Sequence, residues 1–135
     1  MRIFGVVCEC NPLHTGHIWL LSQARARGAE AVVCAMSGHW VQRGECALTD
    51  KWTRAGMALR GGADLVLELP TPWATSSAES FARGGVGILV AAGVVDTLSF
   101  GSEGGDTAPL YRAAACLGSE EYRTALRRFL DKGLP

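Results

Sequence analysis

Two histidines, His14 and His17, stand on either side of a glycine in the run His14-Thr15-Gly16-His17 near the start of the chain. In a helix, side chains three residues apart project from one side, so both imidazoles can donate hydrogen bonds to one group of oxygen atoms. Gly16 has no side chain to hold a phosphate away from the backbone. A helix N-terminus also offers free N–H groups and the positive end of its dipole. The run therefore predicts a site for nucleotide phosphates.

Nucleotidyl transfer suits such a site, because it depends on positioning and charge stabilisation rather than on covalent chemistry by the protein. The helix dipole contributes only about 0.3–1 kcal/mol, so the histidines and further cations must supply more. Lys51 and Arg54, one turn apart, are candidates for phosphate contacts, and a solvated helix face is an equally good interpretation of both.

The histidine pair has other interpretations. A bare His-x-x-His is more often a surface or helix-capping feature, but its place after an apolar run, with Asn-Pro before it, favours phosphate binding. Cys8, Cys10, His14 and His17 suggest zinc, yet they are not spaced like a structural zinc site. We expect no metal held by protein ligands.

The elements that position these residues follow a repeating pattern. Four apolar runs, residues 3–8, 31–36, 65–69 and 94–100, start roughly thirty residues apart, the length of a strand–helix–strand unit. They lack alternation of apolar and polar residues, which is typical of parallel strands covered on both faces. The sequence thus predicts one α/β domain over residues 1–135, an open parallel sheet with crossover helices.

Helical patterns fill the gaps between the runs and follow the last one. We expect a helix over 15–27 that ends at Gly28, and one capped by Thr49 or Asp50 that buries Trp52, Ala55 and Leu59. Ser76 and Glu79 have capping-box spacing for a third helix. Two more are expected to start at Pro109 and at Ser119. Ligands of open α/β sheets bind beyond the carboxyl ends of the strands, where the polar, glycine-rich segments of this chain fall.

Composition narrows the class of protein. Apolar residues make up 48% and charged residues 19%, which is typical of a globular chain. Thirteen basic residues balance thirteen acidic ones, so there is no overall basic excess of the kind that marks nucleic-acid-binding surfaces. Five scattered cysteines indicate free thiols, and the first apolar run is too short for a signal peptide or a membrane span. We expect a cytoplasmic protein without membrane contacts.

At these same loops the chain resembles the tRNA(Met) cytidine acetate ligases, in its N-terminal portion only. Residues 7–17 (VCECNPLHTGH) and 36–45 (MSGHWVQRGE) resemble two segments of that family, and residues 50–55, 64–70, 77–82 and 100–103 continue the match in order. The His-x-Gly-His element alone indicates only the nucleotidyltransferase superfamily, whereas Val-Gln-Arg-Gly and Lys-Trp-x-Arg-Ala are more particular. The chain departs from the family at Cys10, where tyrosine is usual, and at His39-Trp40, where Asn-Phe is common.

The resemblance implies ATP-dependent activation of acetate to acetyl-adenylate and acetyl transfer to N4 of the wobble cytidine of elongator tRNA(Met), with Mg²⁺ accompanying ATP. It implies catalytic roles for His14 and His17, and phosphate or substrate contacts by Lys51, Arg54 and Ser102. The residues implied to contact ATP are Val7, Cys8, Glu9, Cys10, Asn11, Pro12, Leu13, His14, Thr15, Gly16, His17, Ile18, Trp19, Leu20 and Gly101.

Family members extend well beyond 135 residues, and most tRNA contacts are implied to lie in that further region. The resemblance therefore implies a Rossmann-like nucleotidyltransferase fold of the HUP type, and we expect an incomplete, truncated nucleotidyltransferase domain. Two alternatives remain open from the sequence: a nucleotide-binding fragment without turnover, and a small-molecule adenylyltransferase of the pantetheine-phosphate type.

Overall fold

The computed structural model describes residues 1–102 and 104–133. Contacts group them into two compact units, residues 1–100 and, in the second unit, residues 101–102 with 104–133. The sequence predicted one domain over 1–135, and the structure divides it because the last two helices contact each other while the sheet and its helices make their own core. The two units are therefore described separately.

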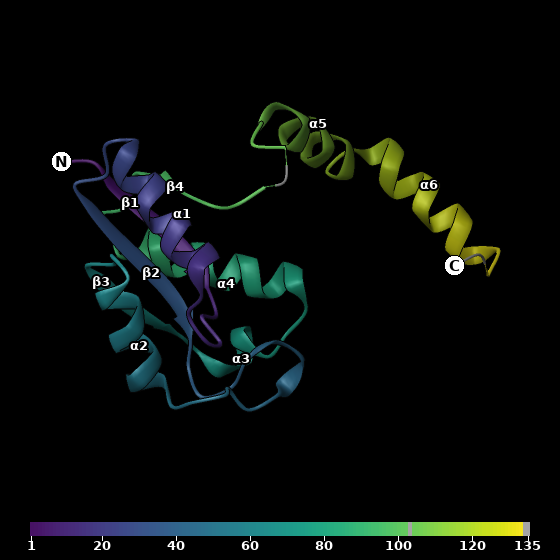
Figure 1. Ribbon diagram of the computed structural model, residues 1–135. Helices are drawn as coiled ribbons and strands as arrows, with labels where there is room; N and C mark the ends of the chain where they lie inside the picture. Colours follow the sequence, from purple (N-terminus) through teal and green to yellow (C-terminus); the bar gives the residue numbers. More distant parts are fainter. Residues whose placement is uncertain (103, 134–135) are drawn as a thin grey trace. The chain divides into compact units, whose positions relative to one another are not determined.

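The first unit is built on a parallel sheet of four strands with the order β3-β2-β1-β4 (Figure 1). The strands are β1 (Ile3–Cys8), β2 (Ala31–Ser37), β3 (Leu65–Leu69) and β4 (Thr97–Leu98). The first three begin at the first residue of a predicted run and β4 begins three residues later, and the predicted α/β class with a parallel sheet is confirmed. β4 is shorter than predicted because the side chain of Asp96 accepts a hydrogen bond from the N–H of Ile3 (2.9 Å), and pairing starts after it.

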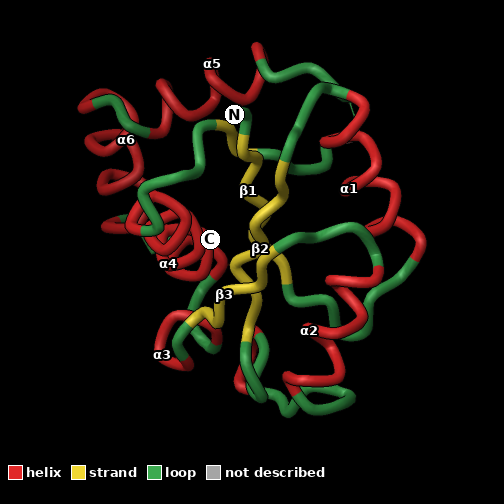
Figure 2. The backbone as a smooth tube through the Cα atoms, turned by 90° about the vertical axis from the view of Figure 1, so that its left-hand side faces the viewer, coloured by secondary structure: helices red, strands yellow, loops and turns green. Residues whose placement is uncertain are grey.

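Helices cover both faces of this sheet. Figure 2 shows α1 (Thr15–Ala26) and α2 (Lys51–Arg60) on one side and α3 (Thr71–Ala74) with α4 (Ala78–Ala91) on the other. A short 3₁₀ turn, η1 (Gln42–Gly44), lies between β2 and α2. This arrangement explains why the strands lack an apolar/polar alternation, since helices cover both faces of the sheet.

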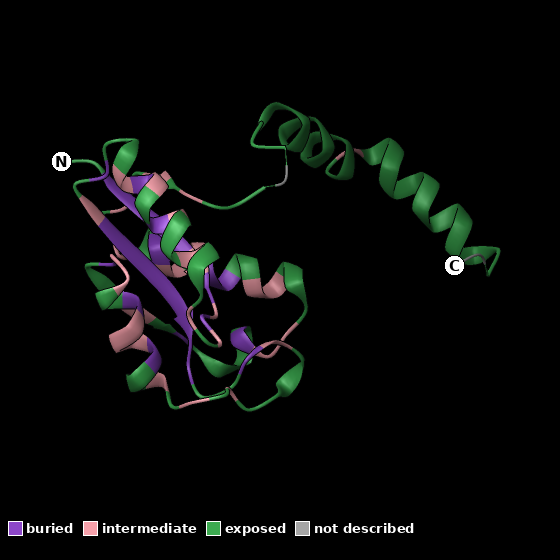
Figure 3. Ribbon diagram, in the orientation of Figure 1, coloured by how far each residue is buried: buried purple, intermediate pink, exposed green. Residues whose placement is uncertain are grey.

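The core consists of two apolar layers, one on each face of the sheet, and Figure 3 shows the buried strands between the helices. The α1/α2 layer includes Phe4, Val6, Cys34 and Met36, and the α4 layer includes Ile3, Val33, Ala35 and Leu89. Burial at roughly 25 cal/mol per Å² of apolar surface is the main stabilising term for a unit of this size.

Two glycines let α4 pack closely against its neighbours, Gly85 against the sheet and Gly84 against α3. A Cβ on Gly85 would overlap the side chain of Val7, with Cγ2 at 2.8 Å, and a Cβ on Gly84 would lie 2.7 Å from Cγ of Trp73. Any larger residue at these positions would push the helix outward. Gly87, two residues after Gly85, faces open space.

Helix caps follow the predicted residues with one correction. Asp50 caps α2, accepting from the N–H groups of Trp52 and Thr53 at 2.9 Å each. The cap of α4 is Ser77 rather than Ser76, and its hydroxyl accepts from Ser80. Ser76 instead donates its hydroxyl to the carbonyl of Trp73, which closes the preceding turn.

The second unit holds α5 (Ala108–Leu117) and α6 (Glu120–Asp131). Pro109 occupies the first turn of α5, and Ser119 caps α6 by accepting from the N–H of Tyr122 at 3.1 Å. Both helices were predicted from these residues.

Candidate active site

The segment that joins β1 to α1 carries the predicted ATP-contacting residues. Val7 and Cys8 end β1, the stretch from Glu9 to Leu13 forms the loop, and the remainder up to Leu20 starts α1. Parallel strands end at one edge of the sheet, so this loop lies at the carboxyl edge beside the end of β2. The sequence predicted that location from the strand pattern.

His14 and His17 form a reciprocal cap at the N-terminus of α1. Nδ1 of His14 accepts from the N–H of Gly16 at 3.1 Å, and Nδ1 of His17 accepts from the N–H of His14 at 3.3 Å. Their ring centroids are 3.9 Å apart. A Cβ on Gly16 would lie 3.0 Å from Cε1 of His14, so the glycine makes room for the ring. The predicted pairing of the two imidazoles on one side of the first turn is present.

The caps also determine which nitrogen of each neutral ring carries the proton. Because each Nδ1 accepts a hydrogen bond, each neutral ring carries its proton on Nε2 and can donate it. Burial, and then the charge of the neighbouring His14, lowers the pKa of His17 from its ordinary value. His17 is therefore a neutral donor at pH 7. The helix-capping interpretation and the phosphate-binding interpretation are compatible, because they use different nitrogens.

Arg54 is buried and binds backbone carbonyls of the β1–α1 connection and of both ends of the β2–α2 connection. Its Nη1 donates to the carbonyl of Glu9 at 2.7 Å, and its Nε donates to that of Thr49 at 3.2 Å. Its Nη2 donates to the carbonyls of Ser37, at 3.1 Å, and Gly38. The side chain has no exposed surface, and burial lowers the pKa of its guanidinium.

The phosphate contact suggested for Arg54 from the sequence is corrected by these bonds. The guanidinium holds the end of β1, the end of β2 and the start of α2 in one arrangement, and it presents no surface to a ligand. The spacing of one turn between Lys51 and Arg54 indicated that both lie on one helix. It did not indicate the direction of the Arg54 side chain.

Two side chains of the first loop bind the second loop. Oε1 of Glu9 accepts from the N–H of Gln42 at 2.7 Å, and Oδ1 of Asn11 accepts from the N–H of Leu48 at 2.7 Å. The Val-Gln-Arg-Gly stretch thus packs directly beside the β1–α1 loop. Sequence reasoning placed both loops at one edge but did not identify these bonds, since a carboxylate can reach many partners.

Cys10 lies in the core rather than on a pocket wall. It is 3% exposed, its Sγ lies 3.4 Å from that of Cys8, and both pack in the α1/α2 layer. The hydrogen bond between the thiols raises the pKa of Cys8 and lowers that of Cys10. At this position, where tyrosine is usual in the resembling family, the cysteine side chain fills part of the core.

A hollow of about 290 Å³ lies where the strand order reverses, between β1 and β4. Ligands of open α/β folds bind at such switch points. The walls are mostly apolar, which suits the flat face of a base. They are formed by Val7, Phe81, Ala82, Val86, Leu98, Ser99 and Phe100.

The remaining candidates lie in two places. Nζ of Lys51 donates to Oε2 of Glu68 at 2.6 Å, at the carboxyl ends of β2 and β3. Gly101 and Ser102 belong to the second unit, and their contacts with ATP stay predictions.

Within residues 1–102 and 104–133, no three histidine, cysteine or acidic side chains gather as a metal site. In the same residues, no helix has the length and apolar character needed to cross a bilayer.

A family model described as HIGH Nucleotidyl Transferase matches residues 1–135. The chain belongs to this family. It is 47% identical to the tRNA(Met) cytidine acetate ligase of Caldanaerobacter subterraneus subsp. tengcongensis, over 99% of this chain and 34% of that protein. It is 53% identical to that of Syntrophotalea carbinolica, over 95% of this chain and 32% of that protein. The resemblance seen in the motifs is confirmed.

Solved structures agree with this assignment. The crystal structure of Thermotoga maritima TmcAL bound with alpha-thio ATP is 45% identical and superimposes with a TM-score of 0.94, over 100% of this chain and 33% of that one. The apo form superimposes with a TM-score of 0.92 at 46% identity. The HIGH family chain described here spans about a third of the length of these relatives.

Proposed function

We propose that this HIGH family chain binds ATP through its β1–α1 segment and serves the ATP-dependent acetylation of tRNA. The observation that carries the proposal is the reciprocal cap of His14 and His17, which leaves two Nε2 donors beside a helix N-terminus. Similarity at 45% identity to a protein bound with alpha-thio ATP supports ATP as the nucleotide.

The proposed reaction has two steps. An oxygen of acetate attacks the α-phosphorus of ATP, the bond to the β-phosphate oxygen breaks, and pyrophosphate leaves with the charge. The N4 amine of the wobble cytidine of elongator tRNA(Met) then attacks the acetyl carbon of acetyl-adenylate, AMP leaves, and the amine loses one proton. His14 and His17 stabilise the phosphate oxygens in the first step by donating from Nε2.

The proposed ATP contacts run from Val7 to Leu20, where Cys8 and Cys10 would contribute main-chain atoms because their side chains are buried. They include Gly101, with Lys51 and Ser102 as further substrate contacts. Mg²⁺ would accompany ATP, since it is usually held by phosphates with one or two carboxylates. Glu9 is the carboxylate in the loop between β1 and α1. Its Oε1 already accepts a hydrogen bond from the N–H of Gln42. We place the protein in the cytoplasm, where the tRNA would be modified.

A nucleotide-binding module without turnover is the second candidate, because similarity to a protein bound with alpha-thio ATP supports nucleotide binding by itself. Calorimetry with ATP and acetate-dependent exchange between ATP and radiolabelled pyrophosphate separate the two. Exchange supports the ligase step, whereas ATP binding without exchange supports the module. Absence of ATP binding at millimolar ATP would overturn both.

A further inference from the structure

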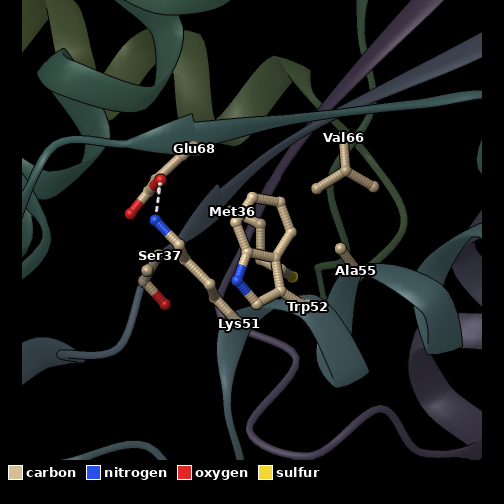
Figure 4. A pocket seen from close by; sticks show the side chains of 8 residues that line it. Met36, Ser37, Lys51, Trp52, Ala55, Val66 and Glu68 are labelled. Atoms are coloured by element: carbon tan, nitrogen blue, oxygen red, sulfur yellow. Dashed lines mark hydrogen bonds and ion pairs between the residues drawn. The ribbon is translucent and has the colours of Figure 1, made fainter.

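A second, smaller pocket lies at the carboxyl ends of β2 and β3, under the first turn of α2 (Figure 4). Its volume of about 60 Å³ admits only a few non-hydrogen atoms. Nothing in the proposed ATP contacts uses it except Lys51.

The pocket has one charged end and one apolar end. Figure 4 shows the ammonium of Lys51 beside Glu68, and Met36, Trp52, Ala55 and Val66 along the rest of the wall. An ammonium group has three N–H donors, and Glu68 takes one of them at 2.6 Å. Two donors are left for an anion, next to a surface that suits a methyl group.

We propose that this pocket binds a small monocarboxylate, with its oxygens on Nζ of Lys51 and its methyl group against Met36, Ala55 and Val66. The assignment to acetate rests on the proposed function. A carboxylate with one methyl has four non-hydrogen atoms, which matches the size of the pocket and both of its ends.

Glu68 acts as a positioning residue for Lys51. A Cβ on Gly38 would overlap Oε1 of Glu68, so glycine at this position lets the carboxylate lie over the backbone and hold the ammonium. Lys51 is only 24% exposed at its side chain and lies over the ring of Trp52, with Nζ 5.1 Å from the centroid. These contacts limit the motion of a side chain that is otherwise flexible.

The pocket is close to the proposed phosphate site. Its wall includes Ser37 and Gly38, whose carbonyls bind Arg54, and the same guanidinium binds the carbonyl of Glu9 in the ATP segment. Neighbouring strands lie about 4.8 Å apart, so the end of β2 is one strand spacing from the end of β1. An acid in this pocket is within reach of a phosphate held at α1.

Nuclear magnetic resonance on the ¹⁵N-labelled chain tests the proposal, with the indole N–H of Trp52 as reporter, assigned with Trp52→Phe. Sodium acetate is titrated against sodium chloride at equal ionic strength. We expect a saturating shift with a Kd on the order of millimolar, at least tenfold weaker binding in Lys51→Met, and no change in the control Arg60→Met at the far end of α2. Butyrate should bind more weakly, because it exceeds the pocket.

Equal saturation by acetate in Lys51→Met, or a shift that never saturates, would overturn the carboxylate site. Saturation by inorganic phosphate at the same concentration as acetate would also overturn it in favour of a general anion site. A parallel ATP titration, followed at the amide of Gly16, reports on the proposed function independently of the acetate arm.

Discussion

His14 and His17 cap each other: each imidazole Nδ1 accepts a backbone N–H of the shared first turn, and the ring centroids lie 3.9 Å apart. The two side chains therefore stabilise the helix start with one nitrogen and keep the other nitrogen as a donor. Structure and proposed chemistry depend on the same pair, so a single substitution affects both and a matched variant is needed to separate them.

The first prediction separates the cap of His14 from its ring. His14→Ala should lower the free energy of unfolding by about 1 kcal/mol, because a helix cap is lost, and should weaken ATP binding at least tenfold. His14→Asn keeps a capping acceptor, so its stability should return while ATP affinity stays low. Calorimetry and denaturant unfolding measure the two effects, with the exposed His39→Ala as control. Full ATP affinity in His14→Asn would remove the ring from the site.

The second prediction concerns pH. Burial and the neighbouring His14 lower the pKa of His17, so the unfolded chain takes up its proton at a higher pH than the folded chain. The contribution of neutral His17 to the free energy of unfolding is complete above the pKa of the unfolded chain, near 6.5. It is lost as pH falls through the lower pKa of the folded chain. Protonation of Nδ1 would also break its bond with the N–H of His14.

Denaturant unfolding from pH 7.5 to pH 5 should therefore show a decrease in stability that is smaller in His17→Gln. Titration of the ring by proton NMR should place its midpoint below that of free histidine. A midpoint at or above the free value would contradict the assigned environment of His17.

The third prediction tests the role of Arg54. Arg54→Met leaves four main-chain carbonyls without their donor, and an unsatisfied buried group costs roughly 1–3 kcal/mol. We expect a loss of about 3 kcal/mol or more in the free energy of unfolding. Arg60→Met, an exposed change on the same helix, should stay within about 0.5 kcal/mol. A similar loss in both variants would argue against a specific role for the buried guanidinium.

The fourth prediction uses two glycines of α4. Gly85→Ala would press against Val7 and push the helix from the sheet, which should cost about 1–3 kcal/mol. Gly87→Ala meets nothing within 4 Å and should stabilise the chain by about 0.5–1 kcal/mol through helix propensity. Thermal unfolding of the two variants should shift in opposite directions. Shifts of the same sign would show that helix packing at Gly85 is looser than described.

The parallel sheet could be predicted because buried strands leave a direct sequence signal in their continuous apolar runs. The rotation of α2 could not. Trp52 was expected to be buried as a large apolar residue, but it is 74% exposed, while Arg54 is fully buried. Hydrophobic periodicity assigns the buried face of a helix from its apolar side chains. It fails where hydrogen bonds to main-chain carbonyls stabilise a buried cation.

The site was predictable in part for a similar reason. His14 and His17 stand out by type and spacing, and their neighbourhood follows from the strand order. The bonds of Glu9 to Gln42 and of Asn11 to Leu48 join residues more than thirty positions apart, so they depend on loop conformation that no local pattern encodes.

The bonds of Arg54 also bear on how freely this region can change in sequence. Each of its acceptors is a main-chain oxygen, and every amino acid supplies one. Substitutions in the surrounding loops, such as the histidine and tryptophan at positions 39 and 40, can thus occur without altering the shape of the carboxyl edge of the sheet. Arg54 preserves this geometry through main-chain oxygens, so the side chains at positions 39 and 40 can vary, whereas Gly38 is restricted by the carboxylate of Glu68.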